Sequence, residues 1–211
     1  MTPRELDDAI ARRRDAALAG HNGDADLARS FLSDANSSVR ATALGALNRI
    51  GALTADQIIT ATTDFDPIVR RRACTESTKW NGEMDEPQDP LVAAAVASLF
   101  EDDDDSVVEI AAWACGERPP VAKEVLERLA NIATTHTDAL CRESAVAALG
   151  AIGDIAGLPA ILSATTDKAT VRRRAIIALA PFDGPEVDAA LAKATEDRDW
   201  QVRQAAEDLS A

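Results

Sequence analysis

The chain has 211 residues, enough for one sizeable core or one short array of repeats. Its hydrophobic content of 46% includes only 3% aromatic residues and much alanine, which favours close helix packing over a β-sandwich. The net charge of -14 argues against indiscriminate binding to nucleic acid or anionic membranes, because the average field repels phosphate.

Cysteine usage indicates a reducing compartment. The three cysteines, Cys74, Cys115 and Cys141, are odd in number and lack a CxxC spacing, which argues against a disulfide framework or a zinc site. The opening stretch MTPRELDDAIARRRDAALAG carries acids and arginines where a signal peptide needs apolar residues. No stretch approaches the roughly 20 apolar residues that span a bilayer. We therefore expect an acidic cytoplasmic protein with no membrane segment, metal or cofactor.

After a predicted capping helix at 1–20, the chain repeats with a period of about thirty residues. In each repeat a polar turn precedes a small apolar residue that is usually followed by Arg. These pairs, called anchors below, are Val39-Arg40, Val69-Arg70, Val107-Val108, Cys141-Arg142, Val171-Arg172 and Val202-Arg203. Successive anchors lie 30, 38, 34, 30 and 31 residues apart. A regular period of this size is typical of stacked supersecondary units.

Both segments of each repeat have the apolar spacing of a helix with one buried stripe. In the first unit this stripe comprises Val39, Ala43, Ala46, Leu47 and Ile50. Trp80 and Phe182 fall at the last stripe position of later units, so we expect them in the core. Each unit is then a helix hairpin too small to bury its own face, and stacking completes the core.

The sequence therefore predicts an all-α solenoid of about six helix hairpins that forms one domain over 1–211. The expected units span about 21–51, 52–80, 88–118, 119–152, 155–182 and 184–211, with an insert loop at 81–90.

The recurring pattern D-x-x-x-x-V-R-x-x-A-x-x-A-L resembles the HEAT and HEAT-like (phycobilisome-lyase-type) repeat family over about residues 20–211. The resemblance implies a right-handed α-solenoid whose second helices line a concave inner wall. It also implies that each anchor arginine pairs with the turn aspartate of a neighbouring unit and holds the stack together. Val108 stands where the third unit should carry Arg, so we expect that contact to be missing there. The arginines expected in this structural role are Arg40, Arg70, Arg142, Arg172 and Arg203.

Two arginine triplets, in DPIVRRRACTESTKW and ATVRRRAIIALAPF, supply the candidate binding residues. The first arginine of each is an anchor, whereas the second, Arg71 or Arg173, falls opposite the buried stripe at 100° per residue. The predicted second helices carry 12 Lys/Arg and 8 Asp/Glu, against 10 and 28 in the rest of the chain. This balance favours a weakly basic inner face, with a merely solvated face as the alternative. The predicted second helices span 40–51, 67–80, 106–118, 138–151, 169–180 and 199–210.

Trp113 also falls opposite the buried stripe, with Glu109 one turn before it and Glu143 at the matching place in the next unit. An exposed Trp is a favoured anchor for a binding partner. The other interpretation is that Trp113 packs against the insert at 81–90. In the first interpretation Arg71, Glu109, Trp113 and Glu143 form one patch.

Catalytic motifs are scarce in this sequence. Phosphate-cradling loops, GxSxG and HExxH are absent, and both histidines are isolated. One enzymatic alternative comes from a similarity to HEAT-like DNA alkylation repair proteins. In that case Arg71 and Arg173 would contact phosphates, while Glu109 or Glu143 would stabilise a developing cationic sugar, as in a DNA glycosylase.

We therefore predict a non-catalytic scaffold that binds a protein partner on its concave face. The face is centred on Arg71, Trp113 and Arg173, with Glu109 and Glu143 beside them, and the expected partner is an acidic or amphipathic segment. The repair-type protein that holds duplex DNA is the alternative, and nucleic acid is the less expected partner.

Overall fold

The computed structural model describes residues 3–82, 89–119 and 121–210. These residues form helices and connecting turns, with no β-strand among them, and the helices pair into the hairpins of an all-α solenoid. The fold class predicted from the repeat is therefore confirmed. Part of the expected insert loop, 83–88, lies outside the described residues.

The chain divides into two compact parts, each larger than a single repeat. We call Met1–Leu99 unit 1 and Phe100–Ala211 unit 2. The short 3-10 helix η2 (Leu99–Glu101) spans the boundary in sequence. The helices of unit 1 are α1 (Pro3–Asn22), α2 (Ala25–Ser30), η1 (Phe31–Ser33), α3 (Ser37–Arg49), α4 (Ala55–Thr62), α5 (Pro67–Lys79) and α6 (Pro90–Ser98). The helices of unit 2 are α7 (Asp105–Glu117), α8 (Lys123–Thr135), α9 (Ala139–Ile152), η3 (Ile155–Gly157), α10 (Leu158–Ala164), α11 (Ala169–Ala178), α12 (Pro185–Ala194) and α13 (Trp200–Ser210).

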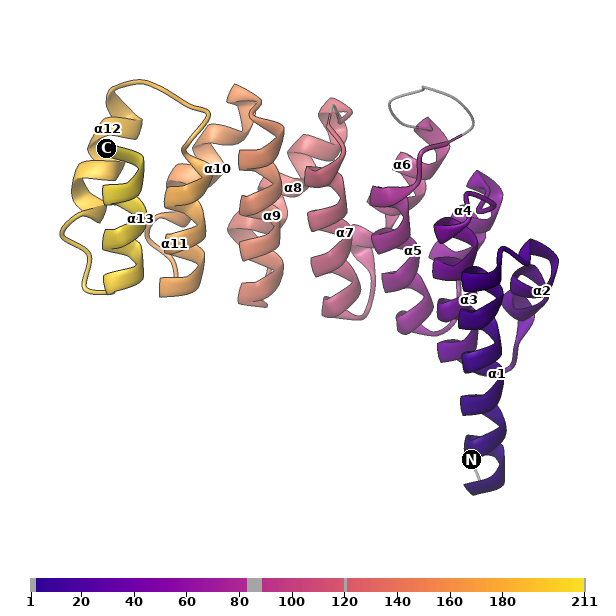
Figure 1. The fold of residues 1–211 in the computed structure, drawn as a ribbon. Helices are drawn as coiled ribbons and strands as arrows, with labels where there is room; N and C mark the ends of the chain where they lie inside the picture. Colours follow the sequence, from indigo (N-terminus) through magenta and orange to yellow (C-terminus); the bar gives the residue numbers. More distant parts are fainter. Residues whose placement is uncertain (1–2, 83–88, 120, 211) are drawn as a thin grey trace. The chain divides into compact units, whose positions relative to one another are not determined.

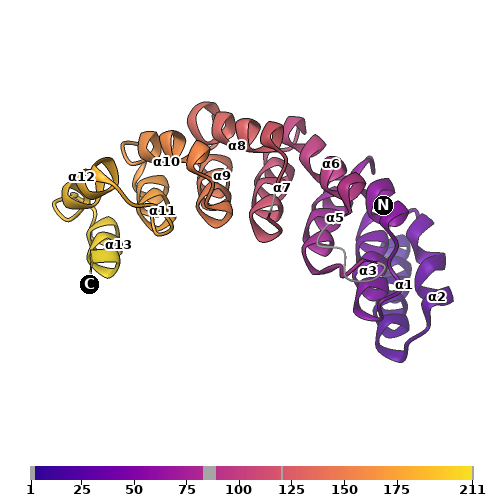
Figure 2. The same ribbon diagram turned by 90° about the horizontal axis from the view of Figure 1, so that it is seen from above.

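Each unit has two layers of helices. In unit 2 the second helices of the hairpins, α7, α9, α11 and α13, lie side by side, and α8, α10 and α12 form the other row (Figure 2). In unit 1, α1, α3 and α5 stack in the same manner, and α4 packs against α6. We call α3 and α5 in unit 1, and α7, α9, α11 and α13 in unit 2, the second-helix layers.

The turns that start the second helices follow ordinary capping chemistry. Asp66, Asp104 and Asp138 each accept a hydrogen bond from a backbone N–H of the first turn that they cap. Pro67 occupies the start of α5, where a missing N–H has no cost. Gly153 ends α9 with a left-handed backbone (φ 70°), which glycine adopts without strain.

The core follows the predicted stripe with two differences. Trp80 and Phe182 are buried as expected, and the Trp80 Nε1–H donates to the Leu53 carbonyl at 2.8 Å. Ile50 is only half-buried, because α3 ends at Arg49 and Ile50 is its C-cap. The second difference is a buried carboxylate on the core stripe of α5, Glu76.

Glu76 is buried within a polar cluster. Its Oε2 accepts a hydrogen bond of 2.6 Å from Asn48 Nδ2, and its Oε1 lies 2.7 Å from Arg72 Nε. The amide of Asn48 also donates to the Glu76 carbonyl at 3.1 Å. A buried charge persists only with such partners, so this cluster ties α3 to α5.

Glycines allow the second helices to approach each other closely. A Cβ added at Gly150 of α9 would lie 2.6 Å from the Cα of Ala178 in α11. The same construction at Gly116 of α7 gives 2.7 Å to the Cα of Ala148 in α9. Distances this short do not occur between real carbon atoms, so these helix pairs require a residue without a side chain.

The substitution Gly150→Ala tests this close approach. Because the added methyl would meet the backbone of α11, the two helices must separate. We expect the free energy of unfolding to fall by about 1–3 kcal/mol in urea titrations.

Gly45→Ala is the matched control within another second helix. Its added Cβ would meet only the guanidinium end of Arg72, which can turn aside. Arg72 would then leave Glu76 Oε1, whereas Glu76 keeps its bond from Asn48 and the helix gains the better propensity of alanine, so we expect a smaller loss of stability than for Gly150→Ala. Equal destabilisation by the two substitutions would contradict the account.

Candidate functional site

Four aspartates in the turns before second helices accept hydrogen bonds from arginine side chains. We call them the turn aspartates, and the arginines of the repeat anchors are the anchor arginines. The turn aspartates are Asp34 and Asp64 in unit 1, and Asp167 and Asp197 in unit 2.

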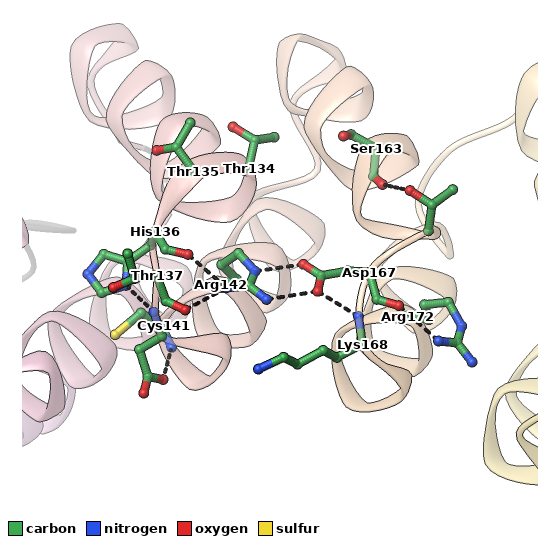
Figure 3. Close-up of polar contacts among 12 residues, drawn as sticks. Thr134, Thr135, His136, Thr137, Cys141, Arg142, Ser163, Asp167, Lys168 and Arg172 are labelled. Carbon is green, nitrogen blue, oxygen red and sulfur yellow. Dashed lines mark hydrogen bonds and ion pairs between the residues drawn. The ribbon is translucent and has the colours of Figure 1, made fainter.

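In unit 2 the anchor arginines Arg142 and Arg172 link consecutive hairpins, whereas Arg203 of the last described hairpin donates from Nη1 to the Asp197 carbonyl of its own turn at 2.7 Å. Arg142 donates from Nε and Nη2 to the two carboxylate oxygens of Asp167 at 2.6 and 2.8 Å, and from Nη1 to the His136 carbonyl at 2.7 Å (Figure 3). Arg172 makes the same bonds one hairpin later, to the carboxylate of Asp197 at 2.8 and 2.7 Å and to the Asp167 carbonyl at 2.8 Å. Arg142 and Arg172 therefore each donate to a carbonyl of their own turn and to the aspartate carboxylate in the turn of the next hairpin.

Unit 1 contains the same linkage. Arg40 binds the Asp64 carboxylate at 2.8 and 2.7 Å and the Asp34 carbonyl at 2.8 Å. Arg70 donates to the Asp64 carbonyl at 2.8 Å. At the start of the array Arg12 of α1 binds the Asp34 carboxylate at 2.6 and 3.2 Å. Sequence reasoning missed Arg12, because the capping helix has no anchor pattern.

These bonds lower the pKa of the turn aspartates. Hydrogen bonds from Arg12, Arg142 and Arg172 are the main cause at Asp34, Asp167 and Asp197. At Asp64 burial raises the pKa of the carboxyl group, but the bonds from Arg40 and from the Asp66 N–H outweigh it. The turn aspartates are therefore charged acceptors, and their bonds are charge-assisted.

One junction in unit 2 uses different residues. Val108, at an anchor position without arginine, is buried, and His136 occupies the place of a turn aspartate. The His136 Nδ1 accepts a hydrogen bond from the Asp138 N–H at 3.1 Å, and its Nε2 lies 3.9 Å from Asp105 Oδ1. The Cys141 thiol donates to the Asp105 carbonyl at 3.1 Å. Both members of the arginine–aspartate pair are thus replaced together.

Within each arginine triplet the three side chains have different surroundings, and equivalent arginines of the two triplets have similar ones. Arg72 and Arg174, the third arginines, lie near carboxylates, with Arg174 Nη2 at 3.4 Å from Glu143 Oε1 and Arg72 beside Glu76. The middle arginines, Arg71 of α5 and Arg173 of α11, are exposed.

The remaining candidates lie in unit 2. Trp113 and Glu109 are half-buried on α7, and Glu143 is half-buried on α9. Arg71 belongs to unit 1, so the single patch that would join it to Glu109, Trp113 and Glu143 stays a prediction. The unit 1 surface contains Arg71, and the unit 2 surface contains Glu109, Trp113, Glu143 and Arg173. The binding role of these residues stays a prediction.

Charge is distributed unevenly between the second-helix layers. In unit 1, α3 and α5 contain six Lys/Arg and one acid, the buried Glu76. In unit 2, α7, α9, α11 and α13 contain five Lys/Arg and six acids. The unit 1 surface is therefore basic, whereas the unit 2 surface carries both signs around Trp113.

Nucleophilic and metal chemistry find little support in the described part of the chain. Burial raises the pKa of the Cys115 and Cys141 thiols to about 12, so both are protonated near neutral pH. Within residues 3–82, 89–119 and 121–210 no three His, Cys, Asp or Glu side chains gather as metal ligands. None of the helices described is both long and apolar enough to cross a membrane.

The family model for HEAT repeats matches residues 55–150, 92–180 and 126–210. No curated protein sequence matches the chain. YibA of Escherichia coli has a similar fold, with 16% identity and a TM-score of 0.62 over 98% of this chain and 74% of YibA.

Two further solved structures are similar. One is the complex of CpcE and CpcF of phycocyanin lyase from Nostoc sp. PCC7120, with 22% identity and a TM-score of 0.62 over 86% of this chain and 74% of that one. The other is a designed armadillo repeat protein in complex with the peptide (KR)4, with 16% identity and a TM-score of 0.58 over 87% and 96%. At these identities the likeness shows the fold alone.

Asp167→Asn tests the structural value of a turn aspartate. The amide keeps the shape but loses the charge that Arg142 binds on two oxygens, so we expect a loss of about 1–3 kcal/mol in the free energy of unfolding at pH 7. The lowered pKa means that the aspartate stabilises the fold above the unfolded-state pKa of about 3.9, and that this contribution disappears as the pH falls through the folded-state pKa. The difference between wild type and Asp167→Asn should therefore shrink in urea titrations below about pH 4.

Asp183→Asn, at an exposed carboxylate, is the control and should change stability by less than about 0.5 kcal/mol. A constant gap between wild type and Asp167→Asn from pH 7 to pH 3 would show that the carboxylate charge is not what stabilises the turn.

Proposed function

Because the chain belongs to the HEAT-repeat family, we propose that it is a non-catalytic interaction module that holds a segment of a partner protein on its second-helix layers. Solenoids of stacked helix hairpins present extended surfaces that suit this task, and the HEAT fold is typical of protein-interaction scaffolds. We also propose a cytoplasmic location, which the three buried free cysteines support.

The observation that carries this proposal is that each arginine triplet contains one exposed arginine between two arginines with partners in the protein. Arg172 is engaged by the turn aspartate Asp197, and Arg174 lies near Glu143. Arg173 between them is exposed on the second-helix layer, and Arg71 occupies the same place in its own triplet. An exposed guanidinium can form two parallel hydrogen bonds with a carboxylate of a partner.

Trp113 supports an amphipathic partner. The indole is half-buried on α7 of unit 2, so part of the ring is open to contact. Tryptophan and arginine are enriched among the residues that dominate binding energy. A partner segment with carboxylates for Arg173 and an apolar side chain for Trp113 would match this surface.

The acidic character of the proposed partner follows from the charge on unit 1. Of the six Lys/Arg of α3 and α5, Arg49, Arg71 and Lys79 are exposed, whereas the one acid of these two helices, Glu76, is buried. A designed armadillo repeat protein of similar fold was solved with the basic peptide (KR)4, an example of a solenoid that holds a charged peptide. Because the present chain exposes arginines, the segment that it binds should be acidic, opposite in charge to (KR)4.

The alternative of a DNA alkylation repair protein gains no support. The HEAT family model and the solved structures named above do not point to DNA, and the net charge of -14 opposes phosphate binding. Glu143, one of the two candidate catalytic residues in that alternative, lies 3.4 Å from Arg174.

Binding of a labelled synthetic peptide of alternating Glu and Leu tests the proposal by fluorescence anisotropy. We expect Arg71→Glu, Arg173→Glu and Trp113→Ala each to weaken binding about fivefold or more, because the first two remove an exposed cation and the third removes a half-buried indole. The melting temperature should change little in the two arginine variants.

Lys193→Glu is the matched control, since this exposed cation lies on α12, outside the second-helix layer. Equal weakening by Lys193→Glu and Arg173→Glu would reduce the effect to net charge and overturn the proposed surface. A labelled DNA duplex in the same assay should not bind; binding that falls steeply with salt would favour the repair-type alternative.

A further inference from the structure

We propose that α1 is a self-association surface, on which a second copy of this chain docks its own α1 in antiparallel orientation. The inference is independent of the proposed partner surface on the second-helix layers.

One side of α1 is covered and the other is not. Helices α2 and α3 pack against α1, and Ala9, Ala16, Ala19 and Gly20 are buried there. At 100° per residue, Ile10 and Leu18 project away from this buried side, with Leu6 at its margin. These three side chains are 58%, 46% and 45% exposed, respectively.

This apolar exposure is unusual for a helix face that points away from its neighbours in the stack. The outward face of a solenoid helix is ordinarily polar, because it meets water and not the core. On α1 three large aliphatic side chains recur instead within thirteen residues on that face. Exposed apolar stripes rimmed by charge are characteristic of interaction sites.

Charged residues on the same face indicate that the partner is a second copy of α1. Asp7 and Arg14 are both exposed and lie on the outward side, two helical turns apart. When two copies of α1 run antiparallel about the midpoint between Ile10 and Ala11, Asp7 of each copy lies opposite Arg14 of the other. A parallel pair would oppose like charges at both positions, so the pattern fits an antiparallel two-fold pair.

The length of α1 makes the surface accessible. At 20 residues α1 is longer than the 13-residue α3 on which it packs, a difference of about 10 Å at 1.5 Å per residue. Figure 1 shows its first turns extending beyond the end of α3. A second copy can reach Leu6, Asp7 and Ile10 on this overhang without displacing α2 or α3.

The interface is small, so we expect a reversible dimer with a Kd on the order of 10 μM. Sedimentation equilibrium of the full chain from 1 to 200 μM should therefore show a mass that rises from 22.3 kDa toward twice that value. Ile10→Glu should keep the chain monomeric over this range with an unchanged melting temperature. Ile155→Glu, at a 67% exposed apolar residue of unit 2, is the control and should dimerise as wild type does.

Charge reversal tests the antiparallel register. Asp7→Arg alone and Arg14→Asp alone should each weaken dimerisation about tenfold or more, and the double variant should restore it. A wild-type chain that is monomeric at 200 μM, a dimer insensitive to Ile10→Glu, or a double variant as weak as the single ones would overturn the proposal. A monomer that co-sediments with phosphatidylserine vesicles through Ile10 would instead identify lipid as the occupant.

Discussion

The charge-assisted bond between an anchor arginine and a turn aspartate is the interaction on which the stacking of α3 on α5, of α9 on α11 and of α11 on α13 depends. The carboxylate of Asp167 receives Arg142 from the preceding hairpin, while its backbone carbonyl receives Arg172 from its own hairpin. Arg172 then reaches Asp197 of the next hairpin. A stack of alanine-rich helices offers few bulky side chains to define how one hairpin lies on another. These bonds supply directional contacts at the edge of the layer, where both partners are mostly shielded from water.

This linkage also explains why the arginine triplets do not form one uniform basic patch. Successive residues of a helix point 100° apart, so three neighbours meet three environments. Arg172 turns toward Asp197, Arg174 approaches Glu143, and Arg173 faces solvent. The same order holds for Arg70, Arg71 and Arg72 in unit 1. Structural and exposed cations thus alternate along one helix, and the proposed function concerns only the exposed ones.

Much of the fold could be predicted from the sequence, because equivalent side chains occupy equivalent positions in successive repeats. The helix hairpins, the capping aspartates and the buried Trp80 and Phe182 follow from local spacing. Contacts between non-equivalent positions could not be predicted in this way. Arg12 reaches Asp34 without an anchor pattern, and buried Glu76 has one of its two partners, Asn48, on another helix. The close approach at Gly150 depends on which residue of α11 lies opposite, which the period of one helix does not reveal.

The central claim is that neighbouring arginines of one triplet have different tasks, and the stabilities of Arg172→Met and Arg173→Met test it most directly. Methionine keeps most of the aliphatic volume and removes the guanidinium in both variants. In urea titrations at pH 7 the account predicts a loss of about 1–3 kcal/mol for Arg172→Met, which leaves Asp197 without its main partner. For Arg173→Met it predicts a change within about 0.5 kcal/mol. Equal losses in the two variants would contradict it.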